Sequence, residues 1–191
     1  HKIWNKYESL YKRNKKVDGF YFHHHPQSLT KSATSCGTHY FIPEPTIFEV
    51  LNRKIIDKCW FPSVYRPGFH TIRPDSNWFL EQFIPFDYSN QNIKEKKQKI
   101  KTDLSNGRFG DWRRAPNKWF PYHPSHDDYQ IPGNSRRWST RCLNLGTRHR
   151  LLKAEDVMQA FKQADSGSSA ILAFTNHDFR DIRKDIDHVY S

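Results

Sequence analysis

Apolar residues recur at helical spacing in several separate stretches of the chain. Residues 3–13 place apolar side chains on one face and charged or amide side chains on the others, which predicts an amphipathic helix. The same period predicts helices over residues 46–59 and 154–164. Another helix is expected to begin near Ser76, whose hydroxyl is suited to capping.

Short runs of β-branched, aromatic or aliphatic residues lie between these helices and predict strands. They occupy residues 17–25, 63–66, 85–89 and 170–174. Strands that alternate with helices are typical of a parallel sheet, and the continuous apolar run at 170–174 suits a strand covered on both faces. The order predicts an α/β fold, either a barrel or a doubly wound sheet, in a single domain over residues 1–191.

Residues 106–137 mix glycine, proline and aromatic residues without periodicity. This composition predicts a long ordered loop, and such loops often carry function. Within it, Asp111, Trp112 and Tyr122 offer an acidic group and rings that could stack on the face of a sugar. Buried rings that anchor the loop are the alternative interpretation. These three residues are the candidate substrate contacts.

The chain carries 31 Lys and Arg against 20 Asp and Glu, a formal net charge of +11. This charge favours an anionic partner, such as an acidic glycan, a lipid-linked phosphate or nucleic acid. A basic surface that serves only solubility explains the charge equally well. Aromatic residues make up 15% of the chain, so large rings supply part of a core and a disordered tail is excluded.

Three cysteines, Cys36, Cys59 and Cys142, form no CxxC pair. Neither a disulfide framework nor a cysteine-based zinc module is therefore expected, and a reducing compartment such as the cytoplasm is slightly favoured. The longest apolar run is too short to span a bilayer, so we expect no transmembrane segment. Because the sequence begins at His1 rather than Met, we also expect that a segment precedes it.

Two histidines near the end of the first predicted strand are the candidate metal ligands. His23 and His25 are two residues apart, so strand alternation points both rings to one side. Neutral imidazole binds zinc and comparable metals, and a carboxylate typically joins the ligand set. A histidine-rich strand end or a tag remnant is the alternative, although the aromatic residues before His23 argue against a tag.

Other polar residues follow the remaining predicted strands, where parallel folds build their active sites. Arg66 opens the turn Arg66-Pro67-Gly68 and could hold a carboxylate there, with a plain turn as the alternative. Asp87 belongs to the next strand end. His177 follows the last strand and could exchange protons near neutral pH, with a hydrogen-bonded core histidine as the alternative.

Taken in order, five short motifs resemble the later motifs of the NodB-homology polysaccharide deacetylase family. They are HHHP at 23–26, YRPG at 65–68, FDYS at 86–89, DW at 111–112 and ILAFTNHDF at 171–179. Each motif is short, and the order carries more weight than any single match. The resemblance spans residues 17–180.

This resemblance implies a distorted parallel (β/α) barrel, incomplete without its first strand, that removes acetyl groups from N- or O-acetylated sugars with one divalent metal. It implies metal binding by His23 and His25, with zinc preferred over cobalt, nickel or manganese. It also implies that Arg66 orients a carboxylate, that Trp112 lines the pocket and that His177 is the general acid. The partner would be an acetylated glycan in surface polysaccharide biosynthesis.

Two features depart from the family pattern. The family commonly spaces its two histidines one helical turn apart, whereas this chain has HxHP, so the choice among the three adjacent histidines stays open. The first family motif, an aspartate pair that supplies the base and a metal ligand, is not found before residue 17. We expect it in a preceding segment, because a barrel without its first strand leaves a backbone edge unpaired. Asp127-Asp128 lies late in a polar loop and is not assigned this role.

Two other functions compete with deacetylation. A glycan-binding module that has kept the fold without catalysis would bind sugar and release no acetate. A basic nucleic-acid binder would use the lysine-rich residues 94–101, although that run is more simply a solvated helix face or loop, and we expect no nucleic-acid partner. No GxGxxG, Walker-type or GxSxG motif supports a nucleotide-binding or nucleophile-elbow site.

Overall fold

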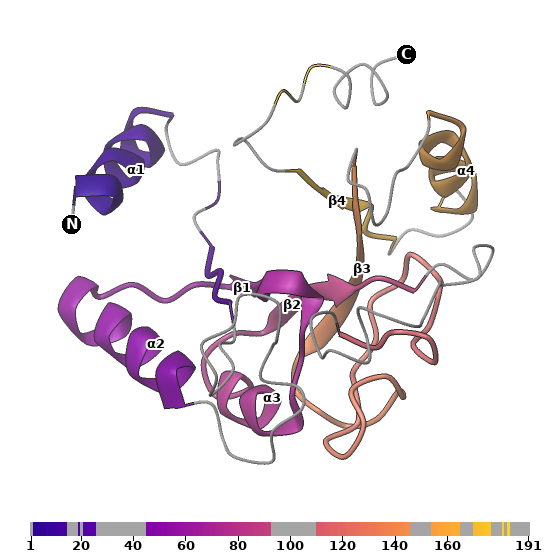
Figure 1. Cartoon of the computed structure of the whole chain (residues 1–191), viewed down its shortest axis with the longest axis horizontal. Coiled ribbons are helices and arrows are strands. Elements are labelled where there is room, and N and C mark those ends of the chain that lie inside the picture. The colour runs from indigo at the N-terminus through magenta and orange to yellow at the C-terminus, as the bar shows by residue number, and fades with distance from the viewer. Residues whose placement is uncertain are drawn as a thin grey trace.

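Four parallel strands form a curled sheet at the centre of the protein (Figure 1). The computed structural model describes residues 2–14, 19, 21–25, 45–92, 110–145, 154–164, 170–176, 181 and 183. The strands are β1 (Val64–Tyr65), β2 (Phe86–Asn90), β3 (Trp138–Asn144) and β4 (Ala173–Thr175), and they lie side by side in sequence order. A curled parallel sheet of sequential strands is a half-barrel, which agrees with the expected α/β class and with an incomplete (β/α) barrel.

The curl arises because β3 changes partner along its length. Its first half pairs with β2, where Phe86 lies opposite Trp138, and its second half pairs with β4, where Asn144 lies opposite Thr175. A stagger of this kind tilts strands relative to one another and closes a sheet towards a barrel. The carboxyl ends of all four strands therefore rise along one edge of the sheet.

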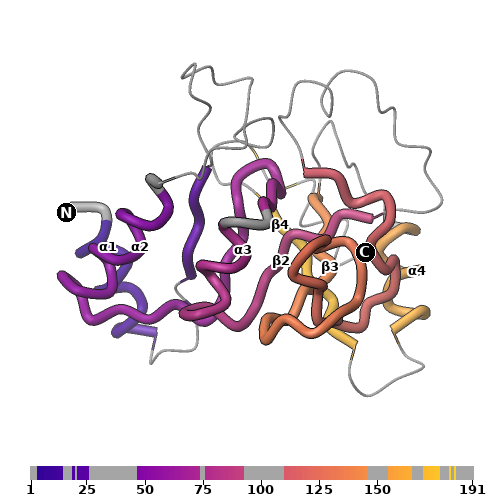
Figure 2. The backbone as a smooth tube through the Cα atoms, turned by 90° about the horizontal axis from the view of Figure 1, so that it is seen from below, coloured from indigo at the N-terminus to yellow at the C-terminus, as the bar shows by residue number. Residues whose placement is uncertain are grey.

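The helices of the described residues are α1 (Lys2–Arg13), α2 (Pro45–Lys58), α3 (Pro74–Leu80) and α4 (Ala154–Ala164). The helices expected from periodicity over residues 3–13, 46–59 and 154–164 are confirmed. Helices α1 and α2 lie at one end of the molecule and α4 at the other (Figures 1 and 2). None of these helices has the length and apolarity needed to cross a bilayer.

Helix α3 begins earlier than the sequence suggests. Arg73 takes the N-cap position and Pro74 the first turn, so Ser76 lies inside the helix and is not its cap. Proline suits this position because the first helical N–H groups have no partner within the helix, and its φ is already fixed near the helical value. The expectation for Ser76 was therefore wrong.

Two apolar clusters fill the protein. The first lies around β1, α2 and α3, and the second lies between α4 and the second half of β3. Their buried members are Phe22, Ile47, Leu51, Tyr65, Ile72, Leu80, Ile84, Trp112 and Ala115 in the first, and Trp119, Leu143, Leu145, Val157, Ala160 and Ala164 in the second. Burial of these side chains is the main force that holds the helices on the sheet.

Strand β3 is the largest departure from the sequence expectation. The predicted strands at 63–66, 85–89 and 170–174 correspond to β1, β2 and β4, but no strand is predicted at Trp138–Asn144. Six of its seven residues are buried, polar ones included. Arg141, for example, donates from Nε to the Asn92 carbonyl at 3.0 Å and lies 4.6 Å from the centre of the Trp119 ring. Tertiary partners stabilise a strand that has no apolar period of its own.

Candidate functional site

Polar side chains gather where the parallel strands end. His23 follows Phe22, which is bridged to Tyr65 beside β1, and Arg66 directly follows β1. Gln91 follows β2, and Asn144 and Thr175 are the last residues of β3 and β4. Together with two neighbours from the same loops they form what we call the carboxyl-edge cluster: His23, His25, Arg66, His70, Gln91, Asn144 and Thr175. Residues far apart in the sequence therefore meet at one edge of the half-barrel.

The structure brings His23 and His25 together. Their Nε2 atoms lie 3.1 Å apart and their ring centres 4.8 Å apart, at right angles. The ring of His24 lies instead parallel to that of Phe22, 6.2 Å away. Strand alternation explains the split, since residues two apart face the same way and the one between faces the other.

A hydrogen bond fixes the tautomer of His23. Its Nδ1 contacts the carbonyl oxygen of Arg66, which can only accept, so in the neutral ring the proton lies on Nδ1 and the lone pair on Nε2. Metal-binding histidines in proteins are typically oriented by such a bond from the second ring nitrogen. The lone pair of His23 is thus directed at His25.

The histidine pair fits part of a metal site. Two nitrogens that bind one zinc ion each lie about 2.0–2.1 Å from it and so cannot be more than about 4.2 Å apart, and the 3.1 Å between these Nε2 atoms meets that limit. No group of three or more His, Cys, Asp or Glu side chains arranged for a metal occurs among the described residues. A metal ion held by His23 and His25 would therefore need at least one further ligand.

Arg66 is a cation held only by neutral groups. Its Nη2 donates to His70 Nε2 at 2.6 Å and to Asn144 Oδ1 at 3.3 Å, while its Nε is buried without a hydrogen-bond partner. No carboxylate of the described residues forms an ion pair with it. Burial lowers the pKa of Arg66 from its usual value, yet an arginine side chain keeps its charge under all ordinary conditions. Among the described residues, no carboxylate compensates the positive charge that Arg66 brings to the cluster.

His70 supports Arg66 from the buried side. Its Nδ1 lies 3.1 Å from the Ser89 carbonyl oxygen. Its Nε2 lies within hydrogen-bond distance of two donors, Gln91 Nε2 at 2.9 Å and Arg66 Nη2. The Ser89 carbonyl must accept, so Nδ1 carries the proton in the neutral ring. Nε2 then accepts from Arg66 and Gln91, and Asn144 Oδ1, itself an acceptor, lies 3.2 Å from it. Asn144 is oriented in turn by the hydroxyl of Thr175, which donates to its Oδ1.

Trp112 lies beneath this cluster rather than on its surface. Only 1% of the residue is exposed, and its Nε1 donates to the carbonyl oxygen of His70 at 2.8 Å. The ring has no exposed face on which a sugar could stack, so the anchoring interpretation holds for Trp112. It contributes to the site by fixing His70.

The other two predicted substrate contacts have their polar partners outside the cluster. Asp111 is ion-paired with Arg113 at 2.7 Å, and this hydrogen bond lowers the pKa of Asp111 below its usual range. Tyr122 is bridged to Ser139 near the start of β3 and donates its hydroxyl to the Tyr129 carbonyl at 2.7 Å. Ser139 precedes Asn144 by five residues, roughly 16 Å along a strand. Tyr122 therefore lies near the start of β3, away from the strand ends that carry the cluster, and its role as a substrate contact stays a prediction.

Asp87 does not lie at a strand end, where the sequence predicted it. It lies inside the sheet opposite Ser139, is 4% exposed, and accepts a hydrogen bond from Ser89. Burial raises its pKa, and Arg137, 3.9 Å away and fully buried, opposes that rise. Asp87 is half of an interior ion pair and not a strand-end residue. His177, the predicted general acid, lies outside the described residues.

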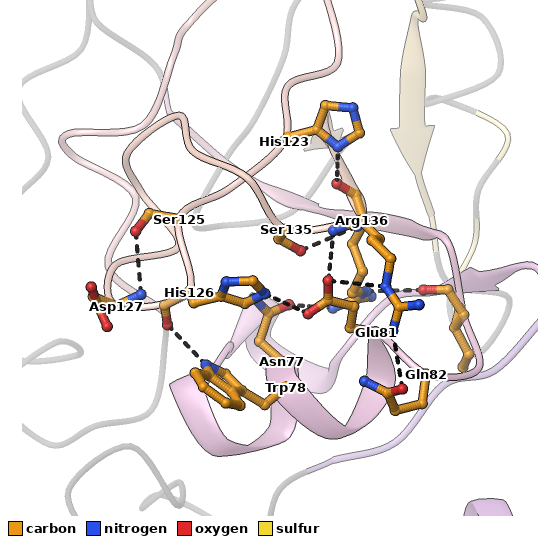
Figure 3. Close-up of polar contacts among 12 residues, drawn as sticks. Asn77, Trp78, Glu81, Gln82, His123, Ser125, His126, Asp127, Ser135 and Arg136 are labelled. Carbon is orange, nitrogen blue, oxygen red and sulfur yellow. Dashed lines mark hydrogen bonds and ion pairs between the residues drawn. The ribbon is translucent and has the colours of Figure 1, made fainter.

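A second polar group occupies the opposite edge of the sheet, where α3 leads into β2 and the long loop leads into β3. Figure 3 shows Glu81 at its centre, approached by His126 and Arg136 from the loop. The Glu81 carboxylate lies 2.6 Å from His126 Nε2 and accepts the Arg136 backbone N–H at 2.7 Å. Asn77 adds a contact of 2.6 Å to Arg137. We call Asn77, Glu81, His126, Arg136 and Arg137 the amino-edge cluster.

Each arginine of the amino-edge cluster has a carboxylate partner, Glu81 for Arg136 and the neighbouring Asp87 for Arg137. Burial of Glu81 would raise its pKa, but the Arg136 backbone N–H and His126 outweigh it, so the net effect is to lower the pKa of Glu81. Elsewhere in the same loop, Asp128 is paired with Arg114 at 2.6 Å. In barrels of parallel strands the amino-terminal edge usually serves stability, and these contacts fit that role.

Sequence reasoning missed His70, Gln91 and Asn144. Asn144 belongs to the strand that the sequence does not predict, and Gln91 follows a strand end without any motif. His70 closes the Arg66-Pro67-Gly68 turn, so the spacing Arg-x-x-x-His was the one signal that could have found it.

Comparison with protein-family models, characterised proteins and solved structures finds no match to this chain. The functional argument therefore depends on the residues and on their arrangement.

Proposed function

We propose that this chain belongs to a metal-dependent deacetylase of the NodB-homology polysaccharide deacetylase type, acting on an N- or O-acetylated polysaccharide or its precursor. The observation that carries the proposal is the His23–His25 pair, with Nε2 atoms 3.1 Å apart beside Arg66. This pair belongs to the edge of the half-barrel at which parallel barrels perform catalysis. The order of the five sequence motifs supports the same assignment.

His23 and His25 would hold the divalent metal, zinc in the first instance. Such an ion, when bound, supplies polarisation of an acyl oxygen and acidification of a water molecule. A carboxylate from outside the described residues would complete the ligand set, as the resemblance implies. His23 is suited to its role because the Arg66 carbonyl holds the ring proton on Nδ1, which places the lone pair on Nε2, the atom that faces His25.

The remaining residues would act on charge and protons. Arg66 orients a carboxylate base through its guanidinium, whose charge has not been cancelled by any carboxylate of the described residues. His177, two residues beyond Thr175 in the chain, delivers a proton to the departing amine nitrogen or alcohol oxygen. The net charge of +11 would attract an acidic glycan to this basic protein.

The decisive experiment measures metal content and acetate release together. The wild-type full-length gene product is compared with a His23→Ala, His25→Ala double variant. His24→Ala is the matched control, because the His24 ring faces away from the other two histidines. We expect about one zinc ion per chain in wild type and in His24→Ala, with loss of both metal and acetate release in the double variant.

Two results would count against the proposal. Metal content that is the same in the double variant would remove His23 and His25 from the metal site. Metal and glycan binding without acetate release from the full-length product would point to the competing function, a glycan-binding module that has kept the fold.

A further inference from the structure

Two consecutive residues after Arg66 adopt a backbone conformation that is costly for their type. Phe69 has φ 54° and ψ 19°, and His70 has φ 52°. Bulky residues rarely adopt positive φ, and such positions persist only where the surroundings enforce them. Glycine would adopt this conformation freely. The one glycine of the turn is instead Gly68, where a Cβ atom would lie 2.3 Å from the ring of His25.

Neighbouring groups hold this strained turn in place. Trp112 donates its Nε1 to the His70 carbonyl at 2.8 Å, and Gly110 donates its backbone N–H to the Phe69 carbonyl at 3.2 Å. Gly110 packs so closely that a Cβ atom there would lie 2.0 Å from the His70 oxygen. The Phe69 ring packs edge-on against His25, with ring centres 4.9 Å apart. Several independent contacts therefore enforce one conformation.

The strained backbone delivers the His70 ring to Arg66. Ser89 fixes the proton on Nδ1, which leaves Nε2 to accept the Arg66 Nη2 donor at 2.6 Å. Strain of this kind gathers at functional sites, where it maintains a geometry that relaxed backbone would not adopt. We propose that His70 is a positioning residue, which holds the Arg66 guanidinium in the orientation that the reaction requires.

The choice of a neutral acceptor has a chemical consequence. An aspartate or glutamate at this position would also orient Arg66, but it would cancel the positive charge. Imidazole and the Asn144 amide orient the guanidinium and leave its charge available to a reacting or ligand carboxylate. The inference rests on the proposed deacetylase function, since it gives Arg66 a role in that reaction.

His70→Gly is the test variant. It removes the imidazole and at the same time relieves the positive φ, so loss of function cannot be attributed to added backbone strain. His70→Gln is the rescue variant, because its amide oxygen is a neutral acceptor. His70→Glu is its isosteric counterpart, which accepts the same hydrogen bond and cancels the charge.

The first readout does not require turnover. Phenylglyoxal modification of individual arginines is followed by mass spectrometry on the full-length protein. We expect the rate at Arg66 to rise about tenfold in His70→Gly and to return close to wild type in His70→Gln. Arg137, which is fully buried, reports unfolding, and Arg113, whose side chain is 47% exposed, reports reagent activity. Neither control should change.

The second readout is acetate release. We expect kcat to fall about 10- to 100-fold in His70→Gly, as for other residues that orient an active-site group, with recovery in His70→Gln and not in His70→Glu. An unchanged rate at Arg66 in His70→Gly, or a rise at Arg66 matched by Arg137, overturns the positioning role. If Arg66 responds to His70 but wild-type protein releases no acetate, the positioning holds and the proposed reaction fails.

Discussion

The two edges of the half-barrel differ in how their charged side chains are paired. At the amino edge, Glu81 meets His126 and Arg136, and just inside the sheet Asp87 meets Arg137, so cations and anions are matched. At the carboxyl edge, the partners of Arg66 in the described part of the chain are the neutral groups of His70 and Asn144. The strained residues Phe69 and His70 also belong to the carboxyl edge.

This difference separates a stabilising network from a candidate site. A buried charge that has a counterion beside it interacts mainly with that counterion, inside the fold. A cation that is oriented but has no counterion can still interact with an anionic ligand or reacting group. Burying such a cation lowers the stability of the folded protein. The comparison predicts that substitutions at the amino edge affect unfolding, while those at the carboxyl edge affect chemistry.

The largest effect on stability is expected for Asp87→Asn. It leaves the fully buried Arg137 cation, 3.9 Å away, without its counterion. Removal of one partner from a buried pair typically costs about 3–5 kcal/mol in the free energy of unfolding. Urea denaturation measures the change, and Asp127→Asn is the control because Asp127 is exposed. A loss below about 1 kcal/mol would mean that the pair does not carry the stability assigned to it.

An intermediate effect is expected for Glu81→Gln, at about 2 kcal/mol near neutral pH, because the carboxylate accepts charge-assisted hydrogen bonds. The folded state lowers the pKa of Glu81. Its contribution is therefore complete above the pKa of an unfolded glutamate, about 4.3, and is lost as the pH falls through the lower folded value. Wild type and variant should converge in acid.

Denaturation at a series of pH values tests this prediction, with Glu49→Gln as control since Glu49 is paired with Arg53 on an exposed helix face. A difference between wild type and Glu81→Gln that does not shrink in acid would show that packing, rather than charge, accounts for the loss.

The smallest effect on stability is expected for Arg66→Met. No ion pair among the described residues is lost, and removal of a partly buried cation offsets the lost hydrogen bonds, so the free energy of unfolding should change by less than about 1 kcal/mol in either direction. Acetate release should nevertheless fall about 100-fold, because the oriented charge is gone. Destabilisation as large as that of Asp87→Asn would erase the distinction between the two edges.

Periodicity predicted the helices well because each buries one face against a core. The stretch 154–164 repeats its apolar residues every three or four positions, and α4 has the expected bounds. The same reasoning failed for β3, whose Ser139, Thr140 and Arg141 are buried against partners that the sequence does not place nearby. Local pattern cannot supply those partners.

The candidate site also contains contacts that a local sequence rule predicts and contacts that depend on the tertiary structure. The juxtaposition of His23 and His25 followed from strand alternation, a local rule. The partnership of Arg66 with Asn144 depends on β3 and on the stagger of the sheet, so no local rule predicts it. The metal, glycan and general-acid assignments remain predictions from the sequence and its resemblance.

The change of partner along β3 has a consequence for synthesis on the ribosome. Once β3 has left the ribosome, its first half can pair with β2, but the strand that pairs with its second half among the described residues, β4, is still to come. The interval includes α4, whose apolar face completes the second core cluster. During that interval the nascent chain presents an unpaired parallel edge beside uncovered apolar surface, a combination that favours aggregation and chaperone binding.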